Sequence, residues 1–127
     1  MQLLGDLDKL HTWTDPDDVA LLMVRVAQEE VAWGRPWHVP SNSPITQRQV
    51  IRDIAIELGI EDPKVSSVPP LIEKTLGLFN PVIRELSHAA YQFNEPFIMS
   101  DENSRKTFGL KPKPWNLVIK DLVKQYL

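Results

Sequence analysis

The sequence predicts an α/β fold with a small, partly parallel sheet of three or four short strands and five or six helices. Short stretches of β-favouring residues alternate with segments whose apolar residues recur at helical spacing. Eleven prolines and five glycines fall between these segments and separate them. The chain has 127 residues, 43% of them apolar, which is enough to build one core. We therefore expect residues 1–127 to form a single domain.

The first strand is expected at residues 10–14, where a Trp and two Thr favour β-structure. A helix follows from Asp15, which can cap it, and Pro16 suits its first position. Two more aspartates there favour the positive end of the helix dipole. The Trp-Gly pair at 33–34 ends this helix. Residues 19–27 are apolar on more than one face, which is typical of a helix that is covered from two sides.

Turn and capping signals place the remaining elements. Thr46 and Gln49 form a capping box for a helix that Gly59 ends. From Trp115, apolar residues at i, i+3, i+4, i+7, i+8 and i+11 predict a last helix through Tyr126. The other expected elements are strands at 37–40, 65–68 and 97–99, and helices from Pro69-Pro70 to Leu78, from Asn80-Pro81 to Phe93, and from a cap at Ser100 or Asp101 to Gly109.

Composition disfavours several classes of protein. The net charge of -3 argues against a general nucleic-acid binder, so no nucleic-acid partner is expected. The absence of cysteine excludes disulfides, thiolate nucleophiles and cysteine-ligated metals. No apolar run approaches the roughly 18 residues that span a bilayer, and the N-terminus lacks the regions of a secretory signal. We therefore expect a cytoplasmic protein with no membrane partner.

The motifs of common cofactor and metal chemistry are missing. The glycines are at least 18 residues apart, so no glycine loop can cradle a pyrophosphate. We expect the chain alone to bind neither NAD(H) nor NADP(H). There is no Tyr-x-x-x-Lys pair, and no histidine has another at i+3 or i+4, so no catalytic or metal-ligating residue is assigned. We interpret His11 and the aspartates at 15–18 as a helix start rather than a metal cluster.

Residues 46–68 offer a helix-turn-helix alternative, with a capped helix, a glycine turn and a polar segment. Pro69-Pro70 would stop the second helix after about one and a half turns, which is short for a recognition helix. A recognition helix also needs basic side chains that reach phosphates. DNA binding is therefore the third hypothesis.

Three motifs, in this order, are informative together. The first motif is the segment at 11–20, His-Thr-Trp-Thr-Asp-Pro-Asp-Asp-Val-Ala. The second is the segment at 37–40 together with the capped helix at 46–59, which ends in Leu-Gly. The third is Phe108-Gly-Leu-Lys-Pro112, which follows a short capped helix. This order and spacing resembles the C-terminal half of the extended short-chain dehydrogenase/reductases, the NAD-dependent sugar-nucleotide epimerases, dehydratases and their relatives. The resemblance covers nearly the whole chain, from about residue 5 to residue 127.

The resemblance implies a substrate-binding half without its Rossmann core. The family's nucleotide fingerprint and catalytic Tyr-x-x-x-Lys lie in an N-terminal half that is absent here, so NAD or NADP would belong only to the intact family. Substrate-facing positions carried over by the resemblance are His11, Asn80, Arg84 and Tyr91. His11 and Tyr91 stand where the family has basic residues, which favours a substrate less anionic than a sugar diphosphate.

Two hypotheses about function follow. The chain is the substrate-binding portion of an NAD-dependent epimerase, dehydratase or reductase-like protein and is not catalytically competent alone; its partners would be a cofactor-binding domain or subunit and a small-molecule substrate. Alternatively, it is a free-standing binding or protein-interaction module. In both cases Leu21 and Val24 add apolar surface to a helix that is already apolar, so we expect a homo-oligomer, most simply a two-fold dimer.

Overall fold

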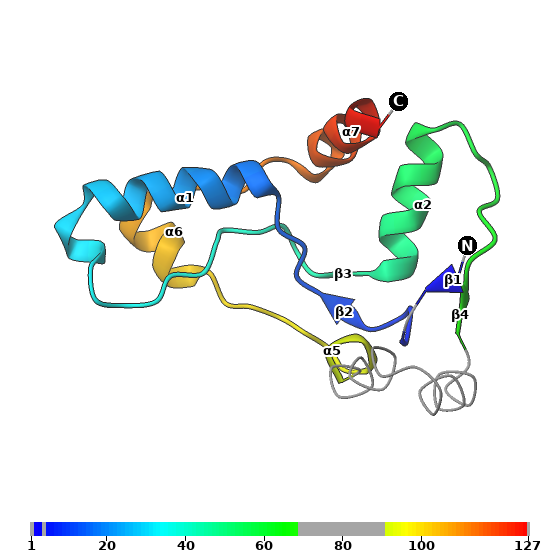
Figure 1. Cartoon of the computed structure of the whole chain (residues 1–127), viewed down its shortest axis with the longest axis horizontal. Helices are drawn as coiled ribbons and strands as arrows, with labels where there is room; N and C mark the ends of the chain where they lie inside the picture. Colours follow the sequence, from blue (N-terminus) through cyan, green and yellow to red (C-terminus); the bar gives the residue numbers. More distant parts are fainter. Residues whose placement is uncertain (1, 4, 69–90, 127) are drawn as a thin grey trace, which may run out of the picture. The chain divides into compact units, whose positions relative to one another are not determined.

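The computed structural model describes residues 2–3, 5–68 and 91–126 and shows a mixed α/β fold (Figure 1). Its helices are α1 (Pro16–Gln28), the 3₁₀ helix η1 (Glu30–Ala32), α2 (Gln47–Glu57), α5 (Tyr91–Asn94), α6 (Glu102–Phe108) and α7 (Trp115–Tyr126). Its strands are β1 (Gln2–Leu3), β2 (Leu10–His11), β3 (Ile45–Thr46) and β4 (Ser66–Ser67). At this level the predicted α/β class is confirmed.

The strands of the described residues form two separate pairs. β1 and β4 are parallel, with Gln2 opposite Ser66, and β2 and β3 are antiparallel, with Leu10 opposite Thr46. An isolated parallel bridge joins His11 to Phe97. The expectation of a small, partly parallel set of strands is confirmed, but two two-stranded pairs replace the single sheet.

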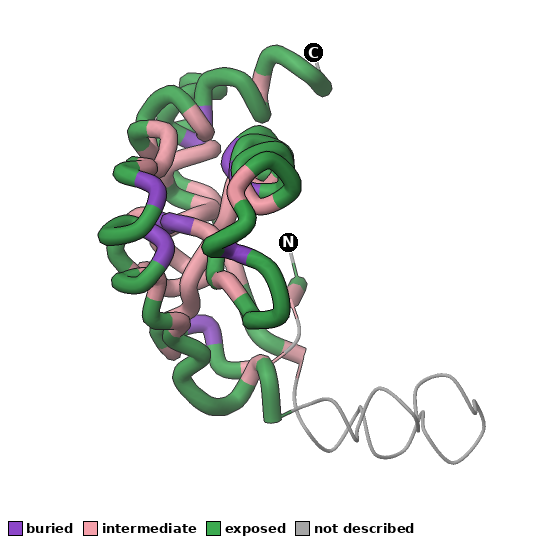
Figure 2. The backbone as a smooth tube through the Cα atoms, turned by 90° about the vertical axis from the view of Figure 1, so that its left-hand side faces the viewer, coloured by how far each residue is buried: buried purple, intermediate pink, exposed green. Residues whose placement is uncertain are grey.

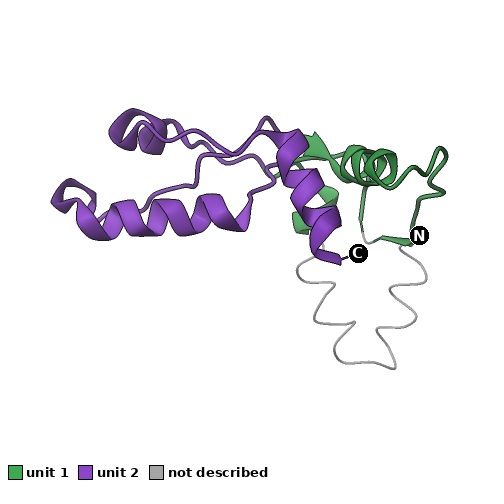
Figure 3. Cartoon of the chain, turned by 90° about the horizontal axis from the view of Figure 1, so that it is seen from above, with its two compact units in different colours: residues 1–11, 45–97 green, residues 12–44, 98–127 purple. Residues whose placement is uncertain are grey.

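The chain divides into two compact units (Figure 3). Unit 1 comprises residues 1–11 and 45–97, and unit 2 comprises residues 12–44 and 98–127. Both strand pairs, α2 and α5 belong to unit 1, whereas α1, η1, α6 and α7 belong to unit 2.

The core of unit 2 lies where α1, η1 and α6 meet. Leu22, Ala32 and Phe108 are each less than 10% exposed, at 4%, 1% and 7% (Figure 2). The ring of Trp37 meets that of Phe108 edge to face, with centroids 4.7 Å apart, and its Nε1–H donates to the carbonyl of Ala32 at 2.7 Å. This geometry satisfies the one polar atom of a half-buried indole.

Unit 1 is held together around its N-terminal segment. Leu7 and Ala55 are buried, and the Arg48 N–H donates to the Leu7 carbonyl at 3.2 Å. Gly5 has a positive φ of 76° and lies directly against Phe93, while the next amide donates to the Phe93 carbonyl at 3.1 Å. The segment thereby links α5 to α2.

Three of the predicted helix boundaries are confirmed by cap geometry. The Asp15 carboxylate accepts from the Asp17 N–H at 2.8 Å, and the Thr46 hydroxyl accepts from the Gln49 N–H at 3.1 Å. Gly109 ends α6 with a φ of 64°. The predicted end of α1 at 33–34 is wrong, because α1 stops at Gln28 and η1 follows.

The predicted strand at 37–40 is wrong. One of its backbone groups is bonded to a side chain instead of a neighbouring strand, because the Ser104 hydroxyl donates to the His38 carbonyl. The His38 ring lies 2.8 Å from the Ser100 carbonyl, which also fixes the segment through a side-chain contact. Proline at both 36 and 40 also limits ladder pairing.

The other strand predictions are right in place but too long. The strand expected at 10–14 is reduced to β2, that at 65–68 to β4, and that at 97–99 to the single bridge at Phe97. β1 and β3 were not predicted. The helix expected at 69–78 and most of that at 80–93 lie outside the described residues, which include only α5 at the end of the second.

Candidate functional site

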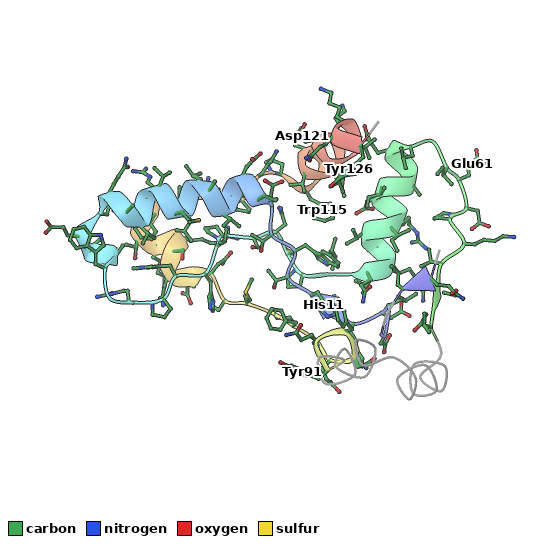
Figure 4. All side chains as sticks on the ribbon, viewed as in Figure 1. His11, Glu61, Tyr91, Trp115, Asp121 and Tyr126 are labelled. Atoms are coloured by element: carbon green, nitrogen blue, oxygen red, sulfur yellow. The ribbon has the colours of Figure 1, made fainter. Side chains whose placement is uncertain are left out.

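The two predicted site residues that the structure describes both belong to unit 1. His11 on β2 has its Nδ1 3.1 Å from the Lys9 carbonyl and its Nε2 2.7 Å from the Gln92 carbonyl on α5. Tyr91, the residue before Gln92, is 63% exposed. In Figure 4, His11 lies above α5 and Tyr91 extends below it. The two side chains therefore flank α5 rather than facing each other, and Asn80 and Arg84 lie outside the described residues.

The hydrogen bonds of His11 favour a positioning role. A neutral imidazole has one N–H, so it can donate to only one of the two carbonyls at a time. A ligand that bound His11 would compete with these backbone acceptors. Because the contact to Gln92 joins residues 81 positions apart, His11 helps to hold α5 against β2.

A cleft that the sequence did not reveal lies elsewhere in unit 1. It has a volume of about 350 Å³, and its polar lining includes Asp8, Arg48, Ser66 and Asn94. A second cleft of similar volume shares Arg48 and Val65 with the first. Hydroxyl, amide and guanidinium groups around a half-apolar surface can bind a small polar molecule. His11 and Tyr91 line neither of these two clefts.

The charged groups of this cleft are already paired. Arg48 Nε and Nη2 donate to the two carboxylate oxygens of Asp8 at 2.7 and 2.9 Å. This bidentate bond lowers the pKa of Asp8 and raises that of Arg48. Both side chains are well exposed, so the pair orients the guanidinium without adding much stability.

The aspartates at the start of α1 bind Lys113 within unit 2. The Asp18 carboxylate, 9% exposed, accepts from the Lys113 N–H at 2.9 and 3.2 Å. Lys113 Nζ lies 2.7 Å from Asp121 and 3.1 Å from Asp17, which raises the pKa of the lysine. The ammonium thus occupies the centre of the cluster. Among the described residues no group of His, Asp and Glu has the geometry to hold a metal.

A second network in unit 2 centres on Ser41, which is 6% exposed. Its N–H donates to Asp101 at 2.7 Å, its carbonyl accepts from Arg105 at 2.6 Å, and its hydroxyl lies 2.8 Å from that of Thr14. Arg105 also contacts Asp101 through Nε and Nη2, at 2.8 and 2.9 Å. First the Arg105 bonds and then the Ser41 amide lower the pKa of Asp101.

We expect this network to make unit 2 sensitive to acid. A carboxylate whose pKa is lower in the folded than in the unfolded chain contributes stability above its usual value of 3.8, and that contribution is lost as the pH falls through the folded value. Urea unfolding followed by Trp fluorescence reports on unit 2, which holds all four tryptophans. The free energy of unfolding should be constant from about pH 7 to 5 and fall below about pH 4. Asp101→Asn should flatten that fall; an unchanged slope would contradict this role.

The outer face of α1 is an exposed apolar surface of unit 2. We use this name for Ala20, Leu21, Met23, Val24 and Ala27, all classed as exposed. At about 100° per residue they occupy one arc of the helix, opposite the buried side chains of Asp18 and Leu22. Leu21, Met23 and Val24 are 46%, 67% and 54% exposed. The expected cover on two sides is not found within the described residues, because α1 has only Asp18 and Leu22 buried.

Comparisons with known proteins give no further guide to the site. No family model matches the chain, and neither a curated protein nor a solved structure matches it. The resemblance to the extended short-chain dehydrogenases therefore rests on its sequence motifs. Within the described residues, no helix combines the length and the apolar character needed to cross a bilayer.

Proposed function

We propose that the chain is a binding module that functions while docked on another polypeptide through the outer face of α1. The observation that carries this proposal is the composition of that helix. Residues 19–27 contain one polar residue, Arg25, yet unit 2 buries only the side that holds Leu22. A helix that is apolar all round is normally covered all round.

Covering the apolar side chains of this face would contribute a free energy comparable to the cost of association. A half-exposed Leu, Met or Val leaves on the order of 80–130 Å² in water, so covering it contributes about 2–3 kcal/mol at 25 cal/mol/Å². Three such side chains contribute roughly as much as the lower estimates of the cost of association, about 4–15 kcal/mol. Contiguous exposed apolar surface of this kind marks interaction sites in soluble proteins.

A narrower candidate follows from the sequence motifs. In it, the polypeptide on α1 is the cofactor-binding half of an NAD-dependent epimerase or dehydratase, and unit 1 contacts the substrate. The order and spacing of the three sequence motifs support it. The chain would supply binding and the partner would supply the cofactor chemistry.

Oxidation of Met23 by hydroxyl radicals tests the proposal. Met23 is 67% exposed, whereas Met99 is partly buried and serves as the internal reference. We expect the ratio of Met23 to Met99 oxidation to fall several-fold either when the chain is concentrated from 0.1 to about 100 μM or when a dilute chain is mixed with the isolated cofactor-binding domain of an epimerase. A constant ratio in both series would overturn the proposal.

A further inference from the structure

We propose that the polypeptide on the outer face of α1 is a second copy of this chain, with the two α1 helices antiparallel across a two-fold axis near Val24. The inference rests on the proposed function, because it names the partner of the same surface. An interface of this kind requires one patch that is complementary to itself. The sequence of α1 meets that requirement.

Side-chain size is complementary in the antiparallel register. With the axis at Val24, Leu21 of one copy lies opposite Ala27 of the other, and the same contact recurs on the other side of the axis. Large side chains therefore meet small ones, as ridges fit grooves between packed helices. Val24 then meets its own counterpart, and the alanines at 20 and 27 leave room for the close approach of the two backbones.

The distribution of charge selects the antiparallel orientation. The outer face carries no charged side chain between residues 20 and 27. The first turn before it carries Asp17, whose side chain is 83% exposed. Parallel helices would bring the two copies of Asp17 together, whereas antiparallel helices hold them at opposite ends and align the helix dipoles favourably. At the other end of α1, Arg25 is paired with Glu29 at 3.4 Å.

The area is sufficient for a dimer of modest affinity. After α1, Val31 and Trp33 are also exposed, at 56% and 60%, and the Trp33 indole donates to the Val26 carbonyl. Five large side chains of this exposure offer roughly 500 Å² per copy and about 1,000 Å² for a pair, the lower limit of specific interfaces. We therefore expect dissociation in the micromolar range.

Single-cysteine variants test the register, because the chain has no cysteine of its own. Helices about 8–10 Å apart bring facing Cα atoms to within disulfide range. We expect Val24→Cys to form a disulfide-linked dimer under mild oxidation. A mixture of Leu21→Cys and Ala27→Cys should form the mixed dimer at least about tenfold faster than either variant forms its own. Asn103→Cys, on the exposed side of α6, is the matched control.

The possible outcomes separate the two proposals. Self-linking of Leu21→Cys that exceeds the mixed product would indicate parallel helices and overturn the antiparallel register. Cross-linking no faster than in Asn103→Cys, with helix content by circular dichroism like that of the unmodified chain, would overturn the second copy. If Met23 were nevertheless protected by the cofactor-binding domain, the proposed function would stand with that domain as the partner. If Met23 were protected in neither series, both proposals would fail.

Discussion

Gly5→Ala is expected to unfold unit 1. A Cβ at this position would lie 2.3 Å from the Phe93 Cβ and 2.7 Å from the Phe93 carbonyl oxygen, far inside van der Waals contact. The positive φ of 76° adds the cost of about 1–2 kcal/mol that a left-handed backbone imposes on any side chain. Together we expect a loss of at least about 3 kcal/mol, which is a large share of the stability of a small domain.

Gly59→Ala is the matched control for this variant. Gly59 also belongs to unit 1 and has a φ of 71°, but an added Cβ meets nothing within 4 Å. It should therefore cost only the backbone contribution of about 1–2 kcal/mol. Thermal unfolding followed by far-ultraviolet circular dichroism measures both variants. Equal losses for the two would show that Gly5 does not lie against Phe93 in solution.

Phe108→Ala is expected to have a comparable effect on unit 2, with a loss of about 3–5 kcal/mol. Phe108 is 7% exposed and carries the edge-to-face contact with Trp37. Its truncation leaves a cavity beside Leu22 and Ala32. The indole of Trp37 should also become more exposed to water.

Tryptophan fluorescence in urea measures this loss, because all four tryptophans lie in unit 2. We expect a lower unfolding midpoint and a red-shifted native emission. Ile98→Ala, at a 58% exposed position of the same unit, should change the free energy of unfolding by less than about 0.5 kcal/mol. A midpoint for Phe108→Ala equal to that of Ile98→Ala would contradict the core described for unit 2.

Some helix boundaries could be predicted from the sequence because capping is local chemistry. Asp15, Thr46 and Gly109 each bond to backbone groups two to four residues away, so both partners of each interaction lie within a few consecutive residues of the sequence. The strands could not be predicted in the same way. Each is two residues long, too short to show an alternating pattern, and the segment at 37–40 was misread because its partner, Ser104, is 66 positions away.

The candidate binding surfaces also differ in whether they could be predicted from the sequence. The outer face of α1 was foreseeable because it depends on periodicity within one helix. The cleft around Arg48 was not, because its lining comes from four separate segments and the Asp8–Arg48 pair joins residues 40 positions apart. For His11, the resemblance supplied a position but not the backbone carbonyl on α5 that its ring meets.

The mass of the chain in solution, measured by light scattering after size exclusion at tens of micromolar, tests the docking surface most directly. The unmodified chain should approach twice its 14.6 kDa mass, and Val24→Glu should return it to 14.6 kDa, because two carboxylates would meet at the axis. Tyr126→Glu, at a 78% exposed position outside the outer face, should associate like the unmodified chain. A 14.6 kDa species for the unmodified chain, or a Val24→Glu variant that associates as well as the original, would contradict the interface.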